Sequence, residues 1–346
     1  MANGVAKARW FRLYLISKNA LNPLKENLGG NLSVEISKEL EFKMGEASEN
    51  ERDTKVKVEG VDLLEEITQQ QYLKRYHKMS DEDIHELTTN MIKNIDSDVS
   101  PDKISKLIDD YLNEKKIVSD TFYLVQDESY KIILIVPDKS VNRVIEKIAK
   151  NSNETPSVFD LPDGPEFLLW LFSKYWNRSK INGINITNIS SVSNMEEQNN
   201  HQYTHRADGE SERDSLEICF KIMLNKAITS LRLQLNFNEK VGIEIEIQIP
   251  DHIKSPKSFR FSIPPIDSIT LPDDISQEIY DFGNTEKLVV KKALGIYILY
   301  SILLTKLILA YKNEQNSWVG KDKMIFINEI YKFAGEKIQR PENGEE

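Results

Sequence analysis

Residues Leu161–Arg178 read LPDGPEFLLWLFSKYWNR. The stretch opens with a Pro/Gly turn, and Pro165 suits the first turn of a helix, where its missing N–H costs nothing. Large apolar side chains then recur at helical spacing, namely Phe167, Trp170, Leu171 and Tyr175. Such a stripe is typical of a helix that packs into a core. We therefore predict that residues 161–180 form a central helix that connects two halves of the protein.

The same stretch ends in basic residues. Lys174 and Arg178 are four residues apart, on one helical face, and Lys180 follows them. A basic helix end of this kind would suit the edge of a polyanion site. The simpler interpretation is a core helix whose charged residues are solvated, and the apolar stripe favours it.

Composition narrows the classes of protein to consider. The chain has 346 residues, a formal net charge of −10 and one cysteine, Cys219. The acidic balance excludes a uniformly basic surface, so nucleic-acid binding would need the positive charge gathered in one place. One cysteine excludes an internal disulfide and a thiolate-rich metal site, and it fits a reducing cytoplasm. Met1–Arg9 lacks the apolar segment of a secretory signal.

An apolar segment near the C-terminus has two interpretations. Residues 293–311 read ALGIYILYSILLTKLILAY, close to the length of about 20 residues that a bilayer span needs. Lys306 lies inside it, and a mid-membrane lysine costs about 2.5–3.5 kcal/mol on insertion scales. We therefore favour a buried or interfacial helix over a membrane span, with Ile298, Ile302 and Leu309 as candidate interface residues.

We expect residues 1–160 to form an N-terminal α+β unit with a helical middle. Residues 9–16 and the pair 121–125 and 130–136 have the composition of strands, and 141–148 that of a covering helix. Residues 62–116 are predicted mostly helical, with Ser80 and Ser100 at helix starts. The acidic residues near those starts are better explained by helix capping than by catalysis.

Residues 181–214 are polar and rich in Asn and Ser, which indicates a loop or insertion. His201 and His205 have HxxxH spacing, but no helix is predicted there and no HExxH arrangement is present. We assign no metal ligand, no cofactor site and no catalytic residue, because no nucleophile, base and orienting acid occur at a recognisable spacing.

Residues 215–346 are predicted to form a β-meander followed by the long apolar helix. Residues 231–237 and 243–249 alternate apolar and polar side chains, which indicates an antiparallel hairpin with one wet face. We expect Arg232 to pair across the strands with Glu244 or Glu246. The overall fold class is α+β: antiparallel sheets with covering helices, in two α+β halves joined by the central helix.

The order of elements is similar to that of a known family. The strand WFRLYL at 10–15, the strand pair and helix at 121–150, EFLLWL at 166–171, KAITSLRL at 226–233 and SITLP at 268–272 occur in that order. Over roughly residues 9–312 the chain resembles divergent members of the recombination-associated, RdgC-like protein family. The polar segment 181–214 and the apolar segment 293–311 depart from the pattern of that family.

That resemblance implies a non-enzymatic function. It implies sequence-independent binding of double-stranded DNA by a ring-like or clamp-like homodimer that modulates recombination, in the cytoplasm at the nucleoid, with a RecA-type recombinase as a possible protein partner. Such a protein needs lysines and arginines directed at phosphates. Our candidates for DNA contact are Arg12, Lys174, Arg178, Lys180, Lys226 and Arg232.

Two alternatives remain open. In the first, the chain is an adaptor or scaffold subunit of a larger complex, such as one in genome defence, with the 293–311 helix as its interface. A metal-dependent nuclease built from scattered carboxylates is the weakest alternative.

Overall fold

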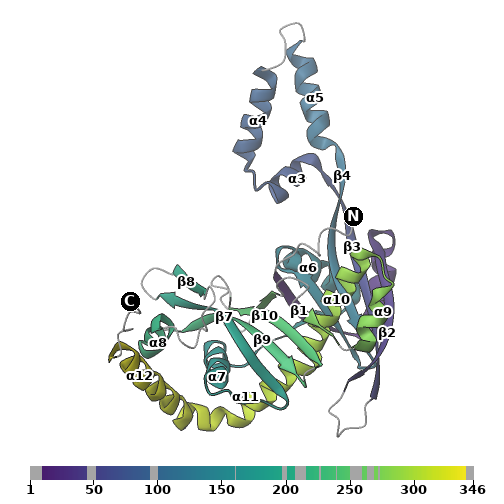
Figure 1. The fold of residues 1–346 in the computed structure, drawn as a ribbon. Coiled ribbons are helices and arrows are strands. Elements are labelled where there is room, and N and C mark those ends of the chain that lie inside the picture. Colours follow the sequence, from purple (N-terminus) through teal and green to yellow (C-terminus); the bar gives the residue numbers. More distant parts are fainter. Residues whose placement is uncertain are drawn as a thin grey trace. The chain divides into compact units, whose positions relative to one another are not determined.

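The computed structural model describes residues 10–44, 52–93, 100–159, 161–196, 201–206, 216–225, 227–238, 240–249, 259–262, 269–271 and 273–339. Contacts divide the chain into two compact units. Residues 1–27, 34–61 and 121–346 form the first, here called the sheet unit, and residues 28–33 and 62–120 form the second, here called the helical unit. This division differs from the predicted boundaries at 160, 180 and 214, because strands from both ends of the chain share one sheet (Figure 1).

The strands form one antiparallel sheet, and helices accompany it, which confirms the α+β class. Along its main path the strands follow the order β2-β3-β4-β5-β1-β11-β10-β9-β7-β8, while β12 pairs with β10 and β6 pairs with β1. The strand bounds are β1 Trp10–Ser17, β2 Leu32–Met44, β3 Arg52–Thr68, β4 Lys115–Gln126, β5 Lys131–Pro137, β6 Ser157–Val158, β7 Ile184–Glu196, β8 His201–Arg206, β9 Ile228–Phe237, β10 Val241–Gln248, β11 Arg260–Ser262 and β12 Ile269–Thr270.

The pairing of β1 with β11 joins the N-terminal and C-terminal parts of this sheet. Trp10 lies opposite Ser262, and Phe11 lies opposite Phe261. On its other edge β1 pairs with β5, whose side chains are buried from Ile132 to Pro137, as its unbroken apolar sequence predicts. The predicted β4–β5 and β9–β10 hairpins are both confirmed.

Helices of the sheet unit cover the sheet and supply the core. Their bounds are α2 Lys18–Leu28, α6 Val141–Ser152, α7 Pro165–Trp176, α8 Leu216–Met223, α9 Asp273–Tyr280, α10 Asn284–Ile298, α11 Thr305–Ser317 and α12 Lys323–Gln339. Short 3₁₀ turns occupy Gly29–Asn31 and Asp138–Ser140, and two π-helical segments, Leu299–Leu304 and Trp318–Asp322, connect α10, α11 and α12.

Helix α7 is a core helix, as its apolar stripe predicts. It packs against β7 and β9, and Phe167, Trp170 and Leu171 are fully buried. On the side of the C-terminal helices, the Trp170 ring centroid lies 5.4 Å from that of Tyr311. This edge-to-face contact stabilises the core beyond what the burial of apolar area alone provides.

The segment 293–311 is mostly buried. The helical run Glu286–Gln339 is long and apolar enough to cross a membrane by length and composition, yet 61% of its most apolar window is buried inside the protein. Leu299, Leu303 and Leu307 are fully covered. Packing within the core therefore accounts for the apolar sequence.

The polar segment 181–214 contains strands where we predicted a loop. Ile184–Glu196 forms β7, which pairs with both β8 and β9. Its register on β9 shifts at three places, so its buried side chains do not alternate regularly with exposed ones. The prediction of a loop was wrong for these residues.

The helical unit contains α3 Gln69–Tyr76, α4 Asp81–Lys93 and α5 Pro101–Asn113, at the ends of β3 and β4. Residues 62–68, predicted helical, instead continue β3. The predicted cap at Ser80 is confirmed: the Ser80 N–H donates to Asp83 Oδ2 at 2.7 Å, and the Asp83 N–H donates to Ser80 Oγ at 3.1 Å. The carboxylate of Asp83 thus serves to start the helix.

Candidate functional site

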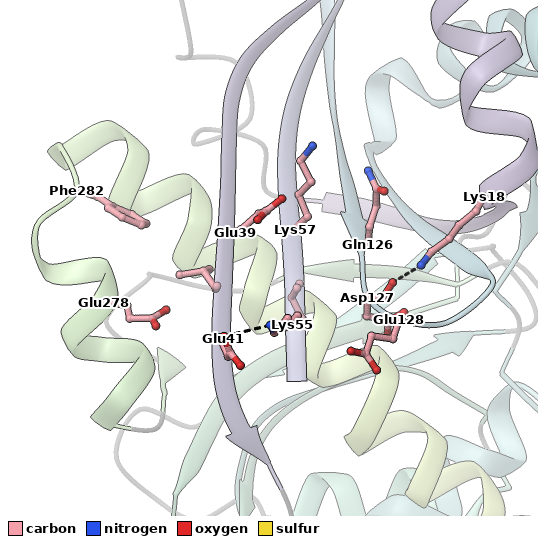
Figure 2. A pocket seen from close by; sticks show the side chains of 12 residues that line it. Lys18, Glu39, Glu41, Lys55, Lys57, Gln126, Asp127, Glu128, Glu278 and Phe282 are labelled. Carbon is pink, nitrogen blue, oxygen red and sulfur yellow. Dashed lines mark hydrogen bonds and ion pairs between the residues drawn. The ribbon is translucent and has the colours of Figure 1, made fainter. Parts of the chain in front are cut away.

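A charged pocket lies in the sheet unit beside β2 and β3. Its volume is about 690 Å³, within the range of ligand pockets. Figure 2 shows the side chains that line it. They are Lys18, Glu39, Leu40, Glu41, Lys55, Val56, Lys57, Gln126, Asp127, Glu128, Glu278 and Phe282. Five carboxylates and three lysines therefore share this pocket, and Leu40 and Val56 form part of its apolar floor.

A network of hydrogen bonds fixes the turn between β4 and β5 at one side of the pocket. The Tyr297 hydroxyl donates to Asp127 Oδ2 at 3.0 Å, and the Ser129 N–H donates to Asp127 Oδ1 at 2.7 Å. Lys18 Nζ donates to the Asp127 carbonyl oxygen at 2.5 Å. Burial, together with the nearby Asp127 carboxylate, raises the pKa of Tyr297 above its ordinary value. Tyr297 is therefore a hydrogen-bond donor and not an acid at neutral pH.

The lysines of β3 are already bound to carboxylates. Lys55 Nζ lies 3.6 Å from Glu41 Oε2, and Lys57 Nζ lies 2.9 Å from Glu59 Oε1. Glu59 is only 3% exposed. Lys25 Nζ approaches it at 3.3 Å and Gln126 Nε2 donates to it at 3.1 Å. Burial alone would raise the pKa of Glu59, but the hydrogen bonds and charges of the two lysines outweigh burial, so its pKa is lowered.

Three carboxylates of the pocket remain available to a ligand. Glu39, Glu128 and Glu278 are exposed, and no ion pair within the described ranges involves them. Phe282 adds a half-buried aromatic ring to the lining, and Lys38 Nζ already lies 4.7 Å from its centroid. Because the lysines of the pocket are engaged and these carboxylates are not, the pocket favours a cationic group.

Three of the predicted DNA contacts are neutralised by carboxylates. Arg12 Nε lies 2.6 Å from Asp138 Oδ1, and Lys174 Nζ lies 2.5 Å from Glu314 Oε2. Arg232 Nε lies 2.6 Å from Glu244 Oε1, which confirms the predicted cross-strand pair. In these positions the three cations offer little free charge to a phosphate.

The other three candidates differ from those in their surroundings. Arg178 and Lys180 follow α7 and are exposed, without an ion pair in the part of the chain that the structure describes. Lys226 lies outside the described residues. A single basic surface formed by these six residues therefore stays a prediction.

The candidate interface residues on the 293–311 helix differ in exposure. Ile298 is fully buried, so its assignment to an interface was wrong: the residue belongs to the core. Ile302 is half-buried and packs against the same core. Leu309 is 55% exposed and alone of the three is free to meet a partner.

No cluster of metal-binding side chains is present among the residues that the structure describes. Within them, no group of three or more His, Cys, Asp or Glu side chains could hold a metal ion. His201 and His205 lie on β8, but the positions of their side chains are outside the described structure.

Sequence reasoning missed the pocket because its lining comes from distant segments. Glu39 and Lys55 lie on neighbouring strands, Glu128 lies in a turn, and Glu278 belongs to a C-terminal helix. No spacing rule connects such positions. The one usable signal was the charge of the predicted turn at 126–129.

Comparison with known proteins adds no assignment. No protein-family model matches the chain, and no curated protein sequence is significantly similar to it.

Proposed function

We propose that this chain is a non-enzymatic adaptor that holds a basic segment of another protein in the charged pocket of the sheet unit. The observation that carries the proposal is the set of exposed carboxylates Glu39, Glu128 and Glu278, which lack a partner within the described ranges. A lysine or arginine side chain that enters the pocket gains these charges, and its aliphatic part finds Phe282 and the apolar floor. The interface of the proposed adaptor is therefore the charged pocket and not the 293–311 helix, because the central residues of that helix are buried.

Peptide binding tests this proposal. We expect the protein to bind a labelled nine-residue peptide rich in arginine and lysine, measured by fluorescence anisotropy, and not a length-matched peptide in which glutamine replaces each basic residue. The triple variant Glu39→Gln, Glu128→Gln, Glu278→Gln should weaken binding at least tenfold, because it removes the three unpaired charges.

A matched variant controls for net charge. Glu82→Gln, Glu86→Gln and Asp109→Asn remove the same number of exposed carboxylates from α4 and α5 and should leave affinity unchanged. Equal loss in both triple variants would show that only the net charge matters and would remove the pocket from the proposal. Competition by spermidine at the same concentration as the peptide would identify a free polyamine as the ligand instead.

A second candidate function is the one implied by the RdgC-like resemblance: sequence-independent binding of duplex DNA by a homodimer that modulates recombination at the nucleoid. The observation in its favour is that Arg178 and Lys180 are exposed and unpaired among the described residues. It ranks second because Arg12, Lys174 and Arg232 are already bound to carboxylates.

Duplex binding at two salt concentrations tests the second candidate. We expect two 30-bp duplexes of unrelated sequence to bind equally at 50 mM salt and more weakly at 200 mM, because counterions are released from the phosphates. The variant Arg178→Glu, Lys180→Glu should abolish this binding, whereas Lys103→Glu, Lys106→Glu on α5 should not. Absence of any duplex binding at 50 mM salt would eliminate DNA as a ligand.

A further inference from the structure

Strand β2 lies at one end of the main path of the sheet and, among the described residues, pairs with β3 alone. Its other edge therefore carries backbone N–H and C=O groups that no described strand uses. The strand is 13 residues long, from Leu32 to Met44, and contains neither proline nor glycine. Such an edge is a template to which another extended chain can form main-chain hydrogen bonds.

The two faces of β2 differ in character. Ile36 and Leu40 are buried and face the core. Because successive side chains of a strand alternate between its faces, the residues between and beside them lie on the opposite face. All of these are exposed, and three of the four are carboxylates: Glu35, Ser37, Glu39 and Glu41. We call Glu35, Glu39 and Glu41 the acidic row.

The acidic row runs out of the charged pocket along the edge of the sheet. Glu39 and Glu41 line that pocket (Figure 2), whereas Glu35 does not. Glu35 and Glu39 are four residues apart on one strand, which separates them by about 13 Å. Neither of them takes part in an ion pair within the described ranges, and Lys55 approaches only Glu41, at 3.6 Å.

These features together identify the occupant of the edge. A helix uses its backbone groups internally, so only an extended chain can satisfy the groups of a free strand. An antiparallel second copy of β2 would bring two acidic rows face to face, and like charges on neighbouring strands are destabilising. A strand with basic side chains has the complementary charge.

We infer that the basic segment of the partner binds as an added strand on the free edge of β2, with a lysine or arginine at every second residue facing the acidic row. The inference rests on the proposed function and adds the conformation and the sequence pattern of the partner. Main-chain hydrogen bonds supply affinity, and the alternating charges select the register of the added strand.

Backbone methylation of a peptide tests the added strand. The probe is a labelled nine-residue peptide in which lysine and threonine alternate. The N–H groups of alternate residues in a strand point to opposite edges, so N-methylation of three lysines blocks one edge and N-methylation of three threonines blocks the other. We expect one methylated peptide to bind at least tenfold more weakly by fluorescence anisotropy, and the other to bind like the unmethylated peptide. Equal affinity of the two methylated peptides would overturn the inference.

A carboxylate outside the pocket separates this inference from the proposed function. Glu35→Lys should weaken binding of the unmethylated peptide about tenfold, because it reverses a charge of the acidic row. Glu336→Lys makes the same change at an exposed position of α12 and should leave affinity unchanged. Circular dichroism checks that both variants are folded. Binding that is indifferent to Glu35→Lys but lost in the triple variant of the pocket would overturn the added strand and keep the pocket. Absence of binding to any basic peptide would overturn both.

Discussion

Truncation of Trp170 to alanine should lower the free energy of unfolding by about 3–5 kcal/mol. The side chain is fully buried in the centre of α7. Its ring centroid lies 5.8 Å from that of Phe167 and 5.4 Å from that of Tyr311, and its Nε1 donates to Glu314 Oε2 at 3.1 Å. The substitution therefore leaves a cavity and removes a hydrogen bond. Urea denaturation followed by circular dichroism measures the loss.

Two variants separate the causes of that loss. Trp170→Phe keeps most of the ring contacts and loses the N–H, so we expect a smaller loss, of about 1–2 kcal/mol. Tyr130→Ala removes an aromatic ring that is 91% exposed and should change stability by less than about 0.5 kcal/mol. If Trp170→Ala were no more destabilising than Tyr130→Ala, α7 would not be the centre of the core.

The elements that sequence predicted well are those whose side chains repeat regularly. In α7 the stripe follows the helical period, and in β9 and β10 the residues from Leu231 to Ile247 alternate between the core and the other face. Regular burial on one face produces a regular sequence. The same regularity allowed the pair between Arg232 and Glu244 to be predicted.

Strand β7 was missed because its burial is irregular. Ile184 and Ile186 keep the period of two, but a register shift follows Ile186, and the next buried apolar residues are Ile189 and Val192. The shifts after Ile186 and Ile189 each add one residue to β7 relative to β9, which changes the face that the next side chain takes. Between these residues lie Asn, Ser and Thr, so the segment reads as a loop until its partner strands are known.

The charged pocket and the long-range ion pairs of Arg12 and Lys174 were missed for a different reason. Arg12 and Asp138 are 126 residues apart, and Lys174 and Glu314 are also distant in the chain. A lysine or arginine in a sequence looks the same whether it faces a phosphate or a carboxylate. Only the tertiary structure shows which cations are neutralised, and it is this information that lowers the rank of DNA binding.

Replacement of Glu59 by glutamine should destabilise the protein by about 2 kcal/mol at neutral pH. The carboxylate is buried and receives Lys25, Lys57 and Gln126 at 2.9 to 3.3 Å. A glutamine of the same shape has no charge to hold the two lysines near the core. Both lysines are about one-third exposed and turn toward water in the variant, which keeps the loss below that of a fully buried ion pair.

The dependence of this loss on pH follows from the lowered pKa of Glu59. A carboxyl group whose pKa is lower in the folded state stabilises the fold above its unfolded pKa, which is about 4.5. That contribution declines as the pH falls from the unfolded pKa through the folded pKa. It is lost at lower pH, where both states bind the proton. Unfolding free energies measured between pH 3 and pH 7 should therefore differ most between the two proteins above the unfolded pKa, and the difference should shrink as the pH falls below it.

Glu41→Gln is the matched control, because Glu41 lies on β2 and pairs with Lys55 of β3 in a more exposed position. Solvent screens that pair, so its removal should leave the stability curve unchanged within error. If Glu59→Gln gave the same curve as Glu41→Gln at every pH, the lysines would not be stabilised by the buried carboxylate. The two lysines that Glu59 holds would then be free cations beside the pocket, and the excess of unpaired negative charge that favours a basic ligand would be lost.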